Sequence, residues 1–251
     1  MIKKLFVPIA TFSVAFETNG KGFLGFIVEL PGAFIRGKTE AEALAKVNQE
    51  VKSYLKWLKI KQDFTYKTNV VQYHQSQLMV EDADSAILLN ADKGEMEEEE
   101  FVNLSELVRY SGKTILKIYH SAELKDWVDG ARIRKTFYGD NFTTIEGIFG
   151  HIKRCQYYYL SRTKIPFEPK EEDFMKIREF CLTKIKELYQ KENNFLIFNT
   201  DNELWTLKKI LRRFIWHDRI HGKAIIRILA KQKELGLIDR YEDPFYFTQP
   251  Q

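Results

Sequence analysis

The stretch WTLKKILRRFIWHDRIHGKAIIRIL, residues 205–229, decides how the C-terminal part of this 251-residue chain folds. Apolar residues recur every three or four positions along it, which is the spacing of one face of an α-helix. We expect a helix over about 202–234, capped by Asp201 or Asn202 and closed by Gly236. Two histidines share its apolar face, which comprises Ile210, Phe214, His217, His221, Ile225 and Ile228.

His217 and His221 lie one helical turn apart, so their rings project from the same face about 6 Å from each other. Because this face is directed at the core, both rings need polar partners. A second predicted helix, about 143–162, places His151 on its own apolar seam in the same way. Neutral imidazole is a ligand for zinc, nickel, copper or iron, and three protein ligands leave one coordination position open, as in catalytic sites. The spacing therefore indicates a metal site at His151, His217 and His221.

The alternative is that these histidines are hydrogen-bonded core residues without a metal, because an i, i+4 spacing also arises by chance. His74 and His120 have no such company, and we interpret both as surface or structural residues. Cys155 lies one turn from His151 on the same seam. It is either a redox or additional ligand residue or small hydrophobic filling, and a buried free cysteine is more often the latter.

The rest of the C-terminal part is helical as well. Apolar stripes predict further helices over about 101–122 and 171–192. Four long amphipathic helices predict an all-α four-helix bundle over 101–251. An acidic block, DKGEMEEEE at 92–100, precedes this bundle, and we interpret it as a solvated linker or the exposed start of a helix.

The N-terminal part, 1–91, has the pattern of a small β-α-β domain, so the whole chain is predicted to be α+β. Asn19-Gly20 is a hairpin signal because both residues tolerate positive φ. Thr39 and Glu42 form a capping box that predicts a helix. Strand-like runs start with the alternating Phe12, Val14 and Phe16 and continue at 23–30, 34–36, 64–73 and 78–89.

Over about 97–240 the chain resembles the DinB-like metal-binding four-helix bundles, which include the bacillithiol- and mycothiol-dependent transferases. TTIEGIFGHIKRCQYYYL (143–160) resembles their second helix with its single histidine, and 205–229 resembles their last helix with its HxxxH pair. The resemblance implies a divalent metal, zinc or nickel first and manganese, iron or cobalt next. It also implies a thiol-dependent transferase or a hydrolase acting on a small electrophilic substrate, with a low-molecular-weight thiol as partner. The matching ligand positions are His151, His217 and His221.

Over about 10–58 the chain resembles the HicB-like antitoxin fold, a partial ribonuclease-H-like domain, through the segment GFLGFIVELPGAFIRGKTEAEALAKVNQEV, residues 22–51. The resemblance implies a protein partner for the N-terminal part. It supplies the alternative function, a non-catalytic, antitoxin-like binding module with a vestigial or structural metal site. Such antitoxins often append a DNA-binding segment, and here the helical part takes its place. The matching positions are Pro31, Gly32, Gly37, Thr39, Glu42 and Ala43.

Net charge, cysteine content and hydropathy exclude several other classes of protein. The net charge, 39 − 35 = +4, is too small to indicate nucleic-acid binding, and apolar residues split the basic run at 208–213. Only Cys155 and Cys181 occur, which excludes a disulfide scaffold and fits a cytoplasmic protein. No apolar run reaches the ~20 residues of a membrane span. Met1–Phe16 imitates a secretory signal, but Pro8 interrupts it, and we interpret it as a strand.

A thiol substrate with carboxylates would need cations near the metal. Arg212, Arg213 and Arg219 are close to the histidines in sequence, but we interpret them as a solvated helix face and assign no catalytic or substrate-binding residue. Edge pairing of the N-terminal strands or packing of the helices would give a homodimer.

Overall fold

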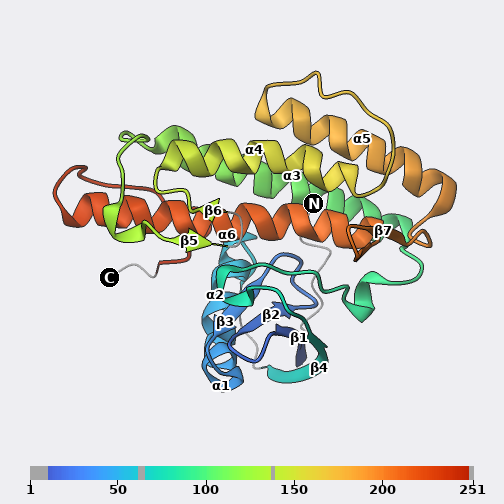
Figure 1. The fold of residues 1–251 in the computed structure, drawn as a ribbon. Helices are drawn as coiled ribbons and strands as arrows, with labels where there is room; N and C mark the ends of the chain where they lie inside the picture. The colour runs from blue at the N-terminus through green and yellow to red at the C-terminus, as the bar shows by residue number, and fades with distance from the viewer. Residues whose placement is uncertain (1–10, 62–65, 137–138, 249–251) are drawn as a thin grey trace.

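The computed structural model describes residues 11–61, 66–136 and 139–248, and it is mixed α+β. Figure 1 shows an N-terminal sheet with its two helices below a layer of long C-terminal helices. Within the described ranges, no helix combines the length and the apolar character needed to cross a lipid bilayer.

The sheet has the strand order β3-β2-β1-β4, with β1 antiparallel to β2 and parallel to β4. The predicted hairpin at Asn19-Gly20 joins β1 to β2, and Gly20 has a φ of +82°, which glycine adopts at no steric cost. Residues 1–10 of the predicted first strand lie outside the described residues. The strands are β1 (Thr11–Thr18), β2 (Phe23–Ile27), β3 (Phe34–Gly37) and β4 (Lys67–Gln75).

The prediction of a strand over 78–89 is wrong. This stretch forms a single 3-10 turn, η2 (Val80–Asp82), followed by residues 84–89, which belong to no helix or strand. Ala83 closes this turn with a left-handed φ of 66°, a backbone conformation that a strand does not contain. The apolar residues that suggested a strand are instead buried between the sheet and Trp216 of the last helix, so they anchor a loop rather than a ladder.

The predicted helix after Thr39 exists in two pieces, α1 (Glu40–Leu44) and α2 (Val47–Trp57). The Thr39 hydroxyl accepts a hydrogen bond from the backbone N–H of Glu42, as the capping box predicts. The Glu42 carboxylate accepts one from the N–H of Lys38 at 2.8 Å. The start of α1 is therefore fixed by its own side chains.

The four predicted long helices are present, with bounds close to the predicted ones. The last helix differs at its start, because the hairpin of β7 and β8 occupies the residues before it. Asp201 and Asn202, predicted as caps, form the turn of this hairpin with φ of 54° and 62°. Thr206 caps the helix instead by accepting the N–H of Lys209. The helices are α3 (Glu98–Ser121), α4 (Ile145–Ser161), α5 (Phe174–Glu192) and α6 (Leu207–Glu234). The short elements are η3 (Asn90–Asp92), η4 (Gly130–Arg132), β5 (Lys135–Thr136), β6 (Gly139–Asp140), β7 (Phe198–Thr200) and β8 (Glu203–Trp205).

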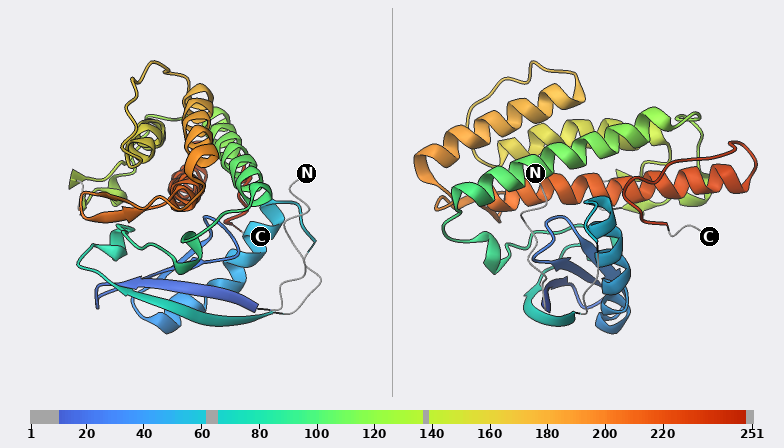
Figure 2. Two further views of the ribbon diagram at one scale, coloured as in Figure 1. Left: turned by 90° about the vertical axis from the view of Figure 1, so that its right-hand side faces the viewer. Right: turned by 180° about the vertical axis from the view of Figure 1, so that it is seen from behind.

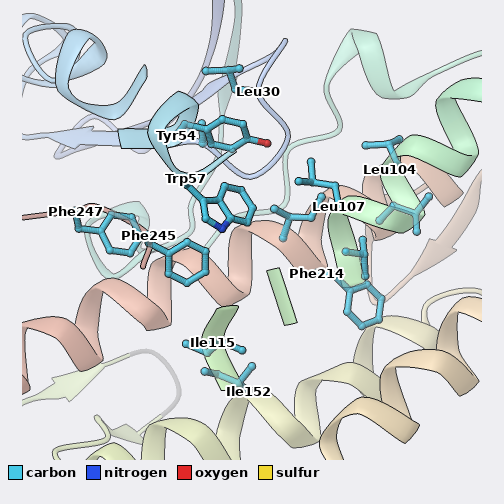
Figure 3. Close-up of a cluster of buried hydrophobic side chains, with 14 of the residues drawn as sticks. Leu30, Tyr54, Trp57, Leu104, Leu107, Ile115, Ile152, Phe214, Phe245 and Phe247 are labelled. Atoms are coloured by element: carbon cyan, nitrogen blue, oxygen red, sulfur yellow. The ribbon is translucent and has the colours of Figure 1, made fainter. Parts of the chain in front are cut away.

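Helix α6 lies in the middle of the molecule, with α3 and α4 packed along it on one side and the N-terminal part on the other (Figures 1 and 2). One cluster of buried apolar residues runs through both parts, from the sheet to the long helices. Figure 3 shows Tyr54 and Trp57 of α2 beside α6, together with Phe245 and Phe247 of the C-terminal segment. The two parts therefore share a core.

The polar side of α6 is also buried, which corrects the interpretation of its arginines as a solvated face. Arg212 pairs with Asp92 at 2.5 Å, and Arg219 pairs with Glu50 of α2 at 2.7 Å. Arg213 is 2% exposed. The positive charge of the run 208–213 is thus largely used within the protein.

The residues of the acidic block, 92–100, differ in their exposure. Glu98–Glu100 form the exposed first turn of α3, where acidic side chains interact favourably with the helix dipole. Asp92, by contrast, is 2% exposed through its pair with Arg212, and Met96 is fully buried. These two contacts tie the segment that connects the sheet to the helices.

Candidate metal centre

The three predicted ligands come from two neighbouring helices. His151 lies near the middle of α4, which begins at the cap Thr144, and His217 and His221 lie in the middle of α6. The helices pack against each other through apolar seams, and the histidines occupy the part of that contact that faces a cavity. The helical spacing read from the sequence therefore brings all three rings together.

The rings are in mutual contact. The centroid of His151 lies 4.9 Å from that of His217 and 4.7 Å from that of His221, and the two α6 rings are 4.3 Å apart. The closest nitrogens are Nε2 of His151 and Nε2 of His217, at 3.1 Å. Two nitrogens at this distance share either a proton or a metal ion.

Cys155 adds a sulfur to the cluster. Its Sγ lies 3.6 Å from both ring nitrogens of His151. The potential ligand atoms of His151, Cys155 and His217 all lie within 4.8 Å of one another, so this group could hold a metal ion. The group shares two residues with the predicted triad and contains Cys155 where the prediction has His221. Cys155 is therefore positioned as a potential additional ligand.

Burial sets the charge of these side chains. Burial lowers the pKa of His151 to about 4, and the charge of Arg154 acts in the same direction. Burial also holds the pKa of His217 and of His221 well below the ordinary value, and repulsion from the neighbouring rings adds to this effect. All three imidazoles are consequently neutral near pH 7, which is the form that binds metals. Burial raises the pKa of the Cys155 thiol to about 11, so this sulfur has to lose its proton to become a ligand.

These residues fit a divalent metal. In a tetrahedral site with metal–nitrogen distances of about 2.0–2.1 Å, neighbouring ligand nitrogens are about 3.3 Å apart. The 3.1 Å between the Nε2 atoms of His151 and His217 is close to this value. The donor set, neutral imidazoles beside a thiol, suits zinc and the neighbouring transition metals rather than calcium or magnesium.

The other two histidines lie elsewhere. His74 is on β4, with Nε2 3.9 Å from Glu17, and His120 is exposed at the end of α3. Neither lines the cavity of the cluster. Both positions agree with their interpretation as surface or structural residues.

A cavity of about 610 Å³ adjoins the cluster and is lined by residues of both the long helices and the N-terminal part. This volume is in the range of small-molecule sites. The walls of this cavity come from segments that are distant in the sequence, and no local sequence pattern connects them. The charged residues that line the cavity are Arg36, Asp82, Asp84, Arg132, Arg134, Glu203, Arg213 and Arg227.

Of the three arginines near the histidines in sequence, only Arg213 reaches this cavity. Its Nη2 donates to the backbone oxygen of Ser85 at 2.5 Å and lies 3.5 Å from Glu203. Arg212 pairs instead with Asp92 of the segment that connects the sheet to the helices, and Arg219 pairs with Glu50 of α2.

Comparisons of this chain with models of protein families, with curated proteins and with solved structures found no match.

Proposed function

We propose that this protein is a metal-dependent enzyme whose divalent ion, zinc or nickel first, is held by His151, His217 and His221. The observation that carries the proposal is the contact of three neutral imidazoles, His217 buried and His151 and His221 half-buried, at the edge of a cavity of about 610 Å³. The likeness of α4 and α6 to the histidine-bearing helices of DinB-like four-helix bundles supports it. Cys155 stands beside the triad as an additional donor for a thiophilic ion.

When bound, such a metal supplies a positive charge that lowers the pKa of a coordinated thiol or water. The chain's own residues hold that ion, exclude bulk water through the apolar seam of α4 and α6, and receive a substrate in the cavity. Asp84 lines the cavity, and burial raises the pKa of its carboxyl. The site therefore contains a titratable carboxyl group that the sequence pattern around the histidines did not indicate.

The reaction class we favour is transfer of a low-molecular-weight thiol to a small electrophile. The thiol loses its proton, its sulfur forms a bond to the electrophilic carbon, and the leaving group departs with the bonding electron pair. Hydrolysis of a small substrate at the same site is the alternative reaction.

The test is a thiol panel. The metal-loaded full chain is incubated with several thiols and a chloroaryl electrophile, and thiol consumption is compared with that of the chelator-treated chain and of His217→Ala. We expect consumption only in the metal-loaded wild type. Consumption no faster than the uncatalysed background with every thiol would contradict the transferase, and a matching ester panel examines hydrolysis.

A binding module remains the second candidate, favoured by the outer strand β4. Val71 and Tyr73 of this strand expose 54% and 58% of their surface, and β4 has no strand neighbour on its outer side among the described residues. Such an edge can accept a further strand from a partner or from a second copy. Val71→Lys should abolish concentration-dependent association measured by light scattering, whereas unchanged association would remove this candidate.

A further inference from the structure

The cavity beside the histidines has a second charged region. Arg36 at the end of β3, Arg134 next to β5 and Arg227 on α6 all line it. They come from three separate parts of the fold, and the N-terminal part contributes one of them. This makes the cavity a joint product of the sheet and the helices.

These three guanidinium groups are poorly neutralised by the protein. Asp82 pairs with Arg134 and also attracts Arg36. Arg227 forms no hydrogen bond or ion pair with any residue that the structure describes, and its charge repels that of Arg36. Three cations therefore share one carboxylate, and burial together with this repulsion lowers the pKa of Arg36.

The remaining charges of the cavity do not offset this excess. Asp84 and Glu203 lie near Arg213 rather than near the three arginines, and Glu203 also pairs with Lys209. Arg132 lies close enough to His221 for its charge to lower the pKa of that ring, which connects the positive region to the metal cluster. An anion at the three arginines would thus sit in the same cavity as the histidines.

We propose that Arg36, Arg134 and Arg227 form an oxyanion-binding site that holds a carboxylate or phosphate group of the substrate. Guanidinium groups recognise both through paired, charge-assisted hydrogen bonds. The cavity leaves room for a small molecule whose anionic end lies at the arginines and whose reacting end lies at the histidines. The last point rests on the proposed function, whereas the anion site can be tested without it.

A neighbouring cavity of about 620 Å³ offers a competing location. It shares Arg36 and Arg227, and its other walls come mainly from the N-terminal part, including Lys38 and Lys46, with Lys223 of α6 and Phe247 added. Arg134 lines only the histidine cavity, and Lys38 lines only the neighbouring one. These two residues therefore distinguish the locations.

The experiment is calorimetric titration of the full chain with inorganic phosphate and, separately, with succinate. We expect one of the two anions to bind, and the tighter one identifies the class of anion. Arg134→Gln and Arg227→Gln should each weaken binding about tenfold or more, because each removes a charge-assisted hydrogen bond. Lys38→Gln and Lys135→Gln, the second of which removes a charge next to Arg134 but outside both cavities, should leave binding unchanged.

The outcomes separate the two proposals. No binding of either anion at millimolar concentration, or loss of binding in Lys38→Gln rather than Arg134→Gln, overturns the anion site. An equal loss in Lys135→Gln would show only general attraction to positive charge and also overturns it. His217→Ala should still bind the anion, and Arg134→Gln should keep the metal content of the wild type, so failure of the metal site leaves this result intact.

Discussion

Lys209 illustrates how the burial of α6 changes the pKa of a single side chain. Its side chain is fully buried, and its ammonium donates to the backbone oxygens of Ala86 and Leu204 and pairs with Glu203 at 2.8 Å. Burial, with repulsion from Arg213 next in importance, lowers the pKa of Lys209 from 10.5 to about 7. The folded protein therefore prefers a neutral lysine at a position where the unfolded chain carries a charge.

This shift predicts a pH dependence of stability. Between about pH 7 and pH 10.5 the unfolded chain binds more protons at Lys209 than the folded protein does, so the free energy of unfolding should rise with pH across this window. Lys209→Met should lose this rise. Urea unfolding of both proteins at pH 7, 8 and 9 measures it, and parallel pH profiles for the two would show that Lys209 keeps its ordinary pKa.

At the same scale, the sequence predicted side-chain contacts between the two neighbouring helices α4 and α6. It did not predict contacts between these helices and the N-terminal part. Helical periodicity alone placed His151, His217 and His221 on two seams, and the rings are in contact. Arg36 and Arg227 could not be connected in this way, because their proximity depends on how the sheet docks on α6. Burial of Arg212 and Arg219 was missed for the same reason, since their carboxylate partners lie in the N-terminal part and the segment after it.

At the scale of elements, the helices were predictable and the chain between them was less so. Apolar stripes and caps are local signals, and α3 to α6 lie close to their predicted bounds. The stretch 78–89 carries strand-like residues that pack as a loop because α6 covers them, a tertiary effect that local propensity does not contain. The start of α6 is set by a hairpin, which displaced the predicted caps.

The Pro31-Gly32 turn gives the prediction at this scale, because it is where the sheet touches α6. A Cβ added to Gly32 would lie 2.5 Å from Cγ2 of Ile215, and the φ of Gly32 is +88°. Gly32→Ala should destabilise the protein by about 2–5 kcal/mol, from left-handed strain plus overpacking. Gly94→Ala is the control, because Gly94 has a φ of +79° with nothing within 4 Å of the added Cβ.

Urea unfolding of both glycine variants isolates the contact with α6. The difference between the two losses of stability is the cost of the clash with Ile215, since the backbone strain is similar. Equal losses in Gly32→Ala and Gly94→Ala would mean that the turn does not pack against the helix as described.

At the scale of the whole molecule, the interface between the N-terminal part and the long helices contributes to both stability and the site. Arg219 sits at this interface with its guanidinium 4.8 Å from the ring of Tyr54 and 5.1 Å from that of Trp57, and it pairs with Glu50 at 2.7 Å. The cavity with the histidines is formed by the same docking. Stability and the site therefore depend on a common interface.

Removing the carboxylate partner of Arg219 tests how much this interface contributes to stability. Glu50→Ala leaves a buried cation without its carboxylate and should cost about 3–5 kcal/mol of the free energy of unfolding. Glu106→Ala removes an exposed partner of Arg109 and should cost less than about 1 kcal/mol. Chemical denaturation compares the two, and a cost for Glu50→Ala as small as that of the exposed control would contradict the buried interface.

The measurement that tests the central claim most directly is the metal content of the purified full chain. Elemental analysis of wild type, His217→Ala and His120→Ala, each supplied with zinc and nickel and then desalted, is compared after circular dichroism has shown equal helix content. We predict about one equivalent of divalent metal in the wild type and in His120→Ala, and its loss in His217→Ala. No stoichiometric metal in the wild type, or unchanged metal in His217→Ala, would contradict the account.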